Sequence, residues 1–187
     1  YYYVDVNGVM AANQWVAIDN EDAGQDDEPE HYWYYFQANG KALKQGDSST
    51  VALKTVNGKK YAFDDEGKML YGWVKSDDAS RIDDTDGDAF KDGDYYFGGE
   101  DDGAMTTGWL LMDITYDEAT NDYEIAPAFN DDEDQSRWFY FKSNGKKYAF
   151  DQYGAMVAEW SLDIAKATAN LGTNSTSAVE KTGNSAQ

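Results

Sequence analysis

The sequence contains no cysteine, which excludes both a disulfide framework and thiol catalysis. Its single histidine, His31, has no evident nucleophile or metal-ligating companion. Long apolar runs are also missing, since no stretch approaches the roughly 18 residues that span a bilayer, and no signal peptide opens the chain. Basic residues are few: 15 Lys and Arg against 36 Asp and Glu give a formal charge of -21. Such a charge repels nucleic acid and anionic lipid surfaces, so neither is expected as a partner.

Aromatic residues are abundant instead and make up 16% of the chain, with 15 Tyr, 8 Phe and 6 Trp. Aliphatic residues are comparatively few, so burial is expected to rely on rings. The segment GKKYAFDDEGKMLYGWV (58–74) returns in outline as GDYYFGGEDDGAMTTGWL (93–110) and as GKKYAFDQYGAMVAEW (145–160). This repetition predicts units that bury their apolar faces against neighbouring units.

Each copy of the repeat has an aromatic residue, a second apolar residue two positions later, a polar turn and Gly. The copies are Tyr2/Val4/Gly8, Tyr34/Phe36/Gly40, Tyr61/Phe63/Gly67, Tyr95/Phe97/Gly103, Phe139/Phe141/Gly145 and Tyr148/Phe150/Gly154. Such alternation before a Gly-containing turn is a hairpin signal, because Asn and Gly supply the positive φ of a tight turn. Four copies continue to Met and Trp, as Met10/Trp15, Met69/Trp73, Met105/Trp109 and Met156/Trp160. We therefore predict an all-β chain of short antiparallel β-hairpins.

The repeats are expected to fill residues 1–160, in larger units over 1–16, 32–74, 91–110 and 137–160. Three acidic insertions separate these units, at 17–31, 75–94 and 112–136. Their composition predicts solvated loops without a core of their own, with short strands around DITYD and DYEIA in the last insertion.

The repeat pattern stops at Ser161. Ser161 as an N-cap, an apolar face at Ile164, Ala165 and Ala169, and Gly172 as a stop predict a short C-terminal helix. The remaining residues to 187 are polar and of low complexity, which is typical of a linker or tail.

The two faces of the predicted strands differ between copies, because side chains two residues apart share a face. One face, such as Tyr34 with Phe36, is aromatic in nearly every copy and is expected to form the core. The other face carries paired rings in some copies, Trp33/Tyr35 and Trp138/Tyr140, but Lys60/Ala62 in another. Paired rings away from a core are typical of a binding surface, so we predict that these two pairs contact a ligand. The alternative is that this face packs against the Trp of a neighbouring unit.

The joint pattern of aromatic strand, Gly turn, Met and Gly-Trp resembles the cell-wall-binding repeats of Gram-positive bacteria, the superfamily that includes choline-binding and glucan-binding repeats. The resemblance is close over 61–73, fair over 95–109, 138–160 and 1–15, and absent from the acidic insertions and from Ser161 onward. It implies a left-handed β-solenoid of hairpins, with ligand sites at the junctions between consecutive repeats.

In choline-binding members of the family, each site is an aromatic box with a Met lining its floor. Such rings suit a quaternary ammonium, which has no hydrogen-bond donor and is attracted by π-faces. The positions that match the box here are Trp33, Tyr35, Trp73, Tyr96, Trp109, Trp138 and Tyr140, with Met69, Met105 and Met156 as the methionines. Other members bind glucans or wall polysaccharide, so choline and glycan both stay open as ligands. Trp15 and Trp160 are not preceded by Gly, and we expect them in capping turns.

The resemblance thus implies a noncatalytic module, without a cofactor, that attaches a secreted bacterial protein to cell-wall or extracellular polysaccharide. Catalysis is disfavoured because nearly all carboxylates stand in runs such as DDED (131–134), where mutual solvation explains them. One alternative is a surface stalk or adhesin whose acidic loops bind a protein partner. Another is calcium binding at DDTDGDAFKDGD (83–94), which fails as an EF-hand at Ile82 and Gly93 but leaves a looser site at Asp84, Asp86 and Asp88.

Overall fold

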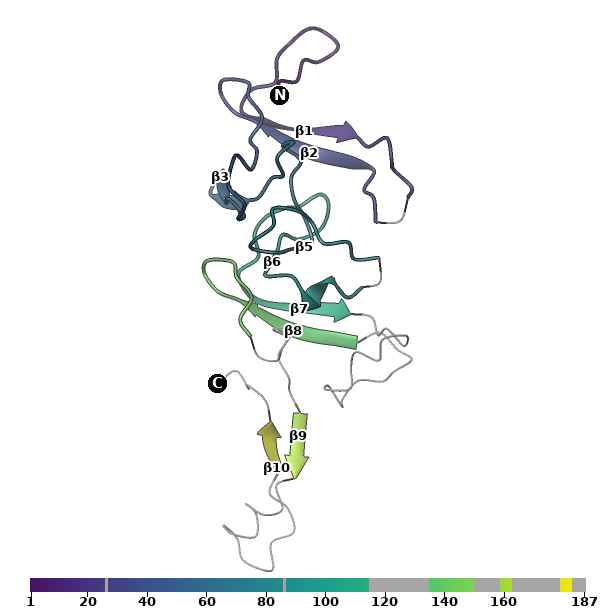
Figure 1. Cartoon of the computed structure of the whole chain (residues 1–187), viewed down its shortest axis with the longest axis vertical. Helices are drawn as coiled ribbons and strands as arrows, with labels where there is room; N and C mark the ends of the chain where they lie inside the picture. The colour runs from purple at the N-terminus through teal and green to yellow at the C-terminus, as the bar shows by residue number, and fades with distance from the viewer. Residues whose placement is uncertain (26, 86, 115–134, 150–158, 163–178, 183–187) are drawn as a thin grey trace, which may run out of the picture. The chain divides into compact units, whose positions relative to one another are not determined.

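The computed structural model describes the chain except residues 26, 86, 115–134, 150–158, 163–178 and 183–187 (Figure 1). Two compact units are present, one of Tyr1–Gly108 with Phe141–Lys147, the other of Trp109–Tyr140 with Tyr148–Gln187. The strands are β1 (Gln14–Asp19), β2 (His31–Phe36), β3 (Lys54–Val56), β4 (Lys59–Tyr61), β5 (Trp73–Val74), β6 (Tyr95–Tyr96), β7 (Gly108–Ile114), β8 (Gln135–Phe141), β9 (Glu159–Leu162) and β10 (Val179–Thr182). A single 3-10 helix, η1 (Ala89–Lys91), and no α-helix occurs in the described part. The predicted all-β class is therefore confirmed, and none of the described segments is a helix long and apolar enough to cross a membrane.

Three ladders join a Trp-bearing strand to the aromatic strand that follows the next insertion. β1 pairs antiparallel with β2, with Trp15 opposite Tyr35, and β5 pairs antiparallel with β6, with Trp73 opposite Tyr96. β7 pairs with β8 (Figure 1). The insertions are thus the loops of hairpins, and the flanking backbone hydrogen bonds keep the rings on either side of an insertion together.

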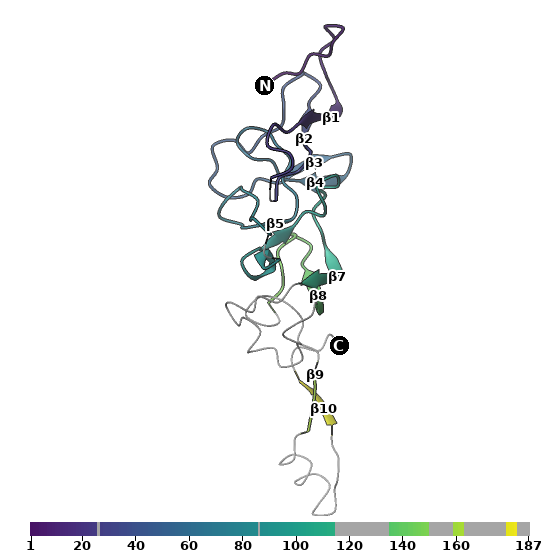
Figure 2. The ribbon, with the colours of Figure 1, turned by 90° about the vertical axis from the view of Figure 1, so that its right-hand side faces the viewer.

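Five of the six predicted Gly turns lie in the described residues and are present, and four of them are each closed by one isolated antiparallel bridge; the turn at Gly154 lies outside the described residues. These bridges are Val4↔Met10, Phe36↔Ala42, Phe63↔Met69 and Phe141↔Lys147. The first unit contains the turn glycines Gly8, Gly40, Gly67, Gly103 and Gly145, all with positive φ. Figures 1 and 2 show these turns of the first unit following one another in sequence order.

Successive turns pack by one recurring contact, in which the residue two positions after a turn Gly lies over the Gly of the next turn. The pairs are Met10 over Gly40, Ala42 over Gly67, Met69 over Gly103 and Met105 over Gly145. A Cβ added to Gly40 would stand 2.5 Å from the Met10 sulfur. The small residue at each turn is therefore required by its neighbour as well as by its own φ.

Backbone hydrogen bonds link the same turns. The residue two positions after each turn Gly donates its N–H to a carbonyl of the preceding repeat: Ala42 to Tyr1 (3.0 Å), Met69 to Trp33 (2.8 Å), Met105 to Lys60 (2.8 Å) and Lys147 to Asp94 (2.7 Å). Packing and backbone bonding thus recur with the sequence repeat, which is the behaviour of a stacked repeat protein.

The core of these repeats consists mainly of the rings expected there. Fully buried side chains from the predicted core face are Phe36, Phe63, Phe97, Phe139 and Phe141. The second insertion also contributes to the core, because Phe90 and Ala89 of η1 are each 2% exposed. The expectation that this insertion is only a solvated loop is therefore wrong; its carboxylates hydrogen-bond to backbone N–H groups and let two apolar residues turn inward.

Two local predictions differ from the structure. Ala62, expected on the outer face, is fully buried, whereas Tyr61 is half-buried, because β4 ends at Tyr61 and the alternation ends with it. Ser161 is not a helix N-cap, because it lies in strand β9 and pairs with Glu180. Glu180 belongs to strand β10, which lies in the segment that was expected to be a linker or tail. The rest of the predicted helix, 163–172, and the segment DYEIA lie outside the described residues, while Asp113 and Ile114 of DITYD belong to β7.

Candidate ligand-binding site

A first aromatic cluster is formed by Trp15, Tyr35, Tyr61 and Phe63 in the first unit. The Trp15 ring centroid lies 5.2 Å from that of Tyr35, 4.8 Å from that of Tyr61 and 5.9 Å from that of Phe63. Phe63 is fully buried, whereas the other three rings are half-buried. The cluster therefore has an apolar floor and three rings that reach the surface, which is an arrangement that can stack on a sugar or hold an organic cation.

A carboxylate stands beside this cluster, on the extended turn that precedes Gly103. Trp33, on the same face of β2 as Tyr35, donates its Nε1–H to Asp101 Oδ1 at 2.8 Å, and His31 Nε2 lies 2.8 Å from the same oxygen. The hydrogen bonds from Trp33 and then His31 hold the pKa of Asp101 below its usual value. Burial, assisted by the charge of Asp102, raises the pKa of Tyr61. The ring face of Trp33 is thus oriented by an ionised side chain.

A second aromatic cluster lies in the second unit and consists of Trp109, Trp138, Tyr140 and Tyr148. The Trp109 centroid is 6.4 Å from that of Trp138 and 5.0 Å from that of Tyr140, which in turn is 6.4 Å from Tyr148. Trp109, Trp138 and Tyr148 are 43%, 42% and 45% exposed. Three large rings at this exposure form a surface on which a flat ligand can stack.

A third group of rings consists of Trp73, Tyr96 and Phe141, and its Trp73 ring is shielded from solvent. Trp73 contacts Tyr96 at 5.1 Å and Phe141 at 5.8 Å between ring centroids, but it is only 4% exposed. Lys147 places its ammonium 5.2 Å from the Trp73 centroid and donates to the Phe90 carbonyl at 2.5 Å. A cation of the chain itself therefore occupies the position over Trp73 that a cationic ligand would take.

The methionines of the resemblance serve packing where they are described. Met69 is 4% exposed and lies over Gly103, and Met105 is half-buried over Gly145. Met156 lies outside the described residues. The two described methionines therefore pack between consecutive turns and do not line the base of the first or second aromatic cluster.

The candidate calcium ligands are engaged in other contacts. Asp84 Oδ1 accepts the Ala89 N–H at 2.9 Å, and Asp88 Oδ2 lies 3.1 Å from the Lys91 ammonium. Asp86 is outside the described residues. Among the residues that are described, no group of three or more acidic or His side chains is arranged to hold a metal ion.

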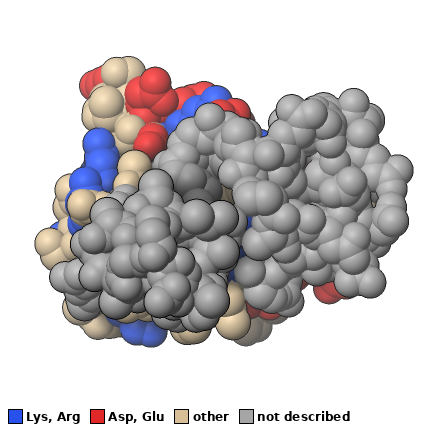
Figure 3. Space-filling view, turned by 90° about the horizontal axis from the view of Figure 1, so that it is seen from below, with Lys and Arg blue, Asp and Glu red and all other residues tan. Residues whose placement is uncertain are grey.

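An ion pair joins the first and second acidic insertions within the first unit. Arg81 of the second insertion pairs with Asp27 of the first at 2.6 Å, and its guanidinium carbon lies 4.6 Å from the Tyr71 ring centroid. Glu28 accepts hydrogen bonds from the Tyr32 hydroxyl at 2.6 Å and from the Asn20 amide at 2.9 Å. Acidic and basic side chains lie next to one another at the visible edge of the described surface in Figure 3. The insertions are therefore fixed elements of the surface.

Sequence reasoning missed three of the ring positions now found in the clusters. Trp15 was expected in a capping turn, Tyr61 in the core, and Tyr148 in the core, yet all three rings reach the surface. Trp15 follows Met10 by five residues, one more than the four-residue Met-to-Trp spacing of the other copies, and this near-repeat could have identified Trp15. The position of the Tyr61 ring beside Trp15 depends on the packing of strands that are far apart in the sequence, so no local signal predicts it.

Comparison with known proteins gives partial matches. The chain matches no protein-family model. It is 27% identical over 181 residues to glucosyltransferase-S of Streptococcus mutans, a match that covers 78% of this chain but 11% of the relative. Two similar solved structures are the autolysin LytC of Streptococcus pneumoniae (19% identity, TM-score 0.41, 79% of this chain and 21% of that one) and choline binding protein F of the same species (21%, 0.35, 88% and 47%). Both TM-scores are below 0.5, so the resemblance rests on the sequence repeat and on the glucosyltransferase match.

The chain thus spans only a small part of the curated relative. Within this chain, the succession of aromatic strand, Gly turn, Met and Trp forms turns that pack on one another, with rings at their junctions. The chain therefore resembles the cell-wall-binding repeats of Gram-positive bacteria, the superfamily of choline-binding and glucan-binding repeats.

Proposed function

We propose that the chain is a noncatalytic module that binds cell-wall or extracellular polysaccharide and anchors a longer secreted bacterial protein at the cell surface. Support comes from one observation above others: both aromatic clusters keep adjacent rings at the surface although long insertions separate them in sequence. Sugar rings present flat apolar faces, so exposed aromatic rings are suitable partners for them.

The residues proposed to contact the ligand are those whose rings reach the surface. They are Trp15, Trp33, Tyr35 and Tyr61 in and beside the first aromatic cluster, and Trp109, Trp138, Tyr140 and Tyr148 in the second. Trp73, Met69 and Met105 are assigned to packing under this proposal. A solenoid over residues 1–160 agrees with the recurring contacts between turns and is part of the proposal.

Choline is a second candidate ligand, favoured at the first cluster. Asp101 supplies a negative charge that is hydrogen-bonded to Trp33, next to the ring surface. A quaternary ammonium gains from both a π-face and a nearby carboxylate.

Tryptophan fluorescence titrated separately with choline, soluble glucan and wall fragments tests the proposal. Trp138→Ala is expected to weaken glycan binding about twofold to thirtyfold, since a ring contact contributes about 0.5–2 kcal/mol. Tyr2→Ala is the control, because Tyr2 is 56% exposed and belongs to neither cluster. Trp15→Ala tests the first cluster in the same way. The proposal fails if no ligand changes the fluorescence, or if both Trp variants bind as the wild type does.

A further inference from the structure

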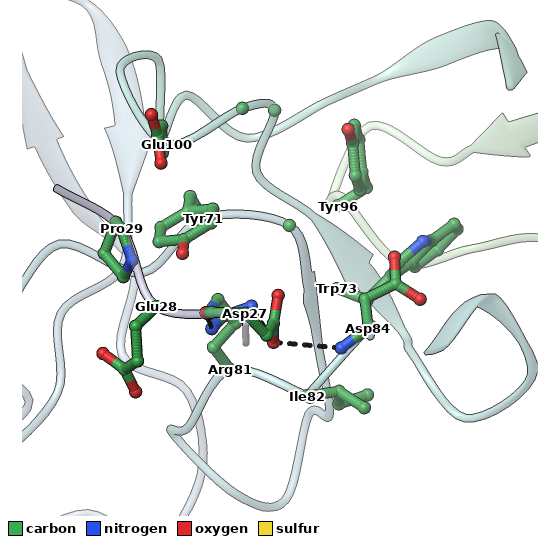
Figure 4. Close-up of a pocket in the computed structure, with 13 residues that line it drawn as sticks. Asp27, Glu28, Pro29, Tyr71, Trp73, Arg81, Ile82, Asp84, Tyr96 and Glu100 are labelled. Atoms are coloured by element: carbon green, nitrogen blue, oxygen red, sulfur yellow. Dashed lines mark hydrogen bonds and ion pairs between the residues drawn. The ribbon is translucent and has the colours of Figure 1, made fainter. Parts of the chain in front are cut away.

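A cavity of about 330 Å³ lies between the two acidic insertions of the first unit, apart from the two aromatic clusters. Figure 4 shows Tyr71 on one side of it and Tyr96 with Asp84 on the other, with Arg81 and Asp27 between them. This volume is at the lower end of the range of small-molecule sites, about 300–1,000 Å³.

The cavity depends on sequence features that the other copies of the repeat lack. Its walls include Asp27 from the first insertion, Arg81 and Asp84 from the second, and Glu100 from the extended turn before Gly103. The neighbouring glycines of that turn, Gly98 and Gly99, add backbone without side chains to the wall. The cavity therefore differs in kind from a junction between two ordinary repeats.

The walls are held in place before any ligand arrives. Asp27 Oδ2 receives the Arg81 guanidinium at 2.6 Å and the Asp84 backbone N–H at 3.0 Å. The side chains of Arg81 and Asp27 are 18% and 19% exposed. A preorganised wall reduces the ordering cost of binding.

The charge of the walls is strongly negative. Four carboxylates, from Asp27, Glu28, Asp84 and Glu100, face one guanidinium, which Asp27 already neutralises. Within the described part of the chain, Glu100 has no hydrogen bond or ion pair. Burial raises the pKa of Tyr71 to about 12, and burial followed by the charge of Asp84 raises that of Tyr96. Both rings therefore stay neutral, with hydroxyl protons to donate.

We propose that this cavity binds one unit of a cationic amino sugar, such as a hexosamine that carries a free protonated amine. The tyrosine rings would contact the sugar ring, while Asp84 and Glu100 would offset the ammonium charge. Arg81 already shows this chemistry in the chain itself, as a cation over a tyrosine ring and paired with a carboxylate. A neutral sugar would displace water from these carboxylates without supplying a countercharge, which is unfavourable.

Isothermal titration calorimetry of the full chain with a β-1,4-linked glucosamine trimer, and with the N-acetylated trimer, tests the proposal. We expect the charged trimer to bind at least about tenfold more tightly than the neutral one. Glu100→Gln is expected to lower the affinity for the charged trimer about threefold. Glu21→Gln is the matched control, because Glu21 is exposed and does not line the cavity. Asp84→Asn, which keeps an oxygen for the Ala89 N–H, is expected to weaken binding further.

The acidic chain attracts any cation, so a lysine trimer serves as the non-sugar control. Equal affinity for the lysine and glucosamine trimers, with no response to Glu100→Gln, would assign binding to the diffuse charge and overturn the proposal. Equal affinity for both sugar trimers would overturn it as well. If Trp138→Ala abolished binding of the charged trimer and Glu100→Gln left its affinity unchanged, the sugar would be placed at the aromatic clusters instead. The cavity is separate from those clusters, so its failure leaves the polysaccharide proposal intact.

Discussion

Replacing Gly103 by alanine tests the packing between consecutive turns. Gly103 has a φ of +64°, and a Cβ there would overlap the sulfur of Met69. Met69 is 4% exposed and so has no open space into which it can swing. The left-handed backbone costs alanine about 1 kcal/mol, and overpacking costs about 1–3 kcal/mol. We expect Gly103→Ala to lower the free energy of unfolding by about 2–4 kcal/mol.

Gly8→Ala provides the matched control, because Gly8 holds the same turn position with a φ of +80° and nothing lies within 4 Å of its added Cβ. At Gly8 we expect only the cost of placing alanine in the left-handed conformation, about 1 kcal/mol. Urea unfolding followed by tryptophan fluorescence measures both losses. In a double variant, Met69→Ala should relieve the overlap, so the two losses should fall short of additivity by at least about 1 kcal/mol. Equal losses at Gly103 and Gly8, or strict additivity, would refute the packing argument.

Three further predictions concern polar groups. Gln45 is 5% exposed and bonds three backbone groups of the following loop, so Gln45→Ala should destabilise the chain by about 1–3 kcal/mol in the same unfolding assay. Burial raises the pKa of Tyr71 from 10.0 to about 12, so its contribution to stability is complete below pH 10 and is lost as the pH rises toward 12; phenolate absorbance, with Tyr71→Phe as control, checks this. The pKa of Asp101 is depressed below 3.8, so the Trp33 hydrogen bond is present above that pH and is lost as the pH falls through the lower folded value. A midpoint of the Trp33 indole proton resonance at or above 3.8 would contradict this assignment.

The core and the turns could be predicted from the sequence because both depend on local pattern. Phe36, Phe97 and Phe141 recur two residues after another aromatic residue, and a ring that returns in nearly every copy indicates a buried position of the repeat. The β3–β4 hairpin likewise follows from Asn57 and Gly58, whose φ values of 49° and 81° suit a two-residue turn.

The ring clusters could be predicted only in part, because they depend on pairing across the insertions. Composition identifies an insertion as acidic but does not reveal that the strands on either side of it pair. The Trp15 to Tyr35 contact follows from that pairing, and the Trp15 to Tyr61 contact needs the next repeat as well. Closure of Trp73 by Lys147 involves residues far apart in the sequence and has no local signal.

The placement of the first acidic insertion as the loop of a β1–β2 hairpin has a consequence for how such modules vary. The chain leaves at Asn20 and returns at Glu30, where the Asn20 N–H donates to the Glu30 carbonyl at 3.0 Å. The free energy of closing a loop rises only slowly with its length. A longer peptide inserted between Asn20 and Asp27 should therefore be tolerated, with the Trp15–Tyr35 pair left in register and the Asp27–Arg81 ion pair kept. The repeats act as a frame, and the part of this insertion before Asp27 is a segment whose length and sequence can vary without disturbing that frame.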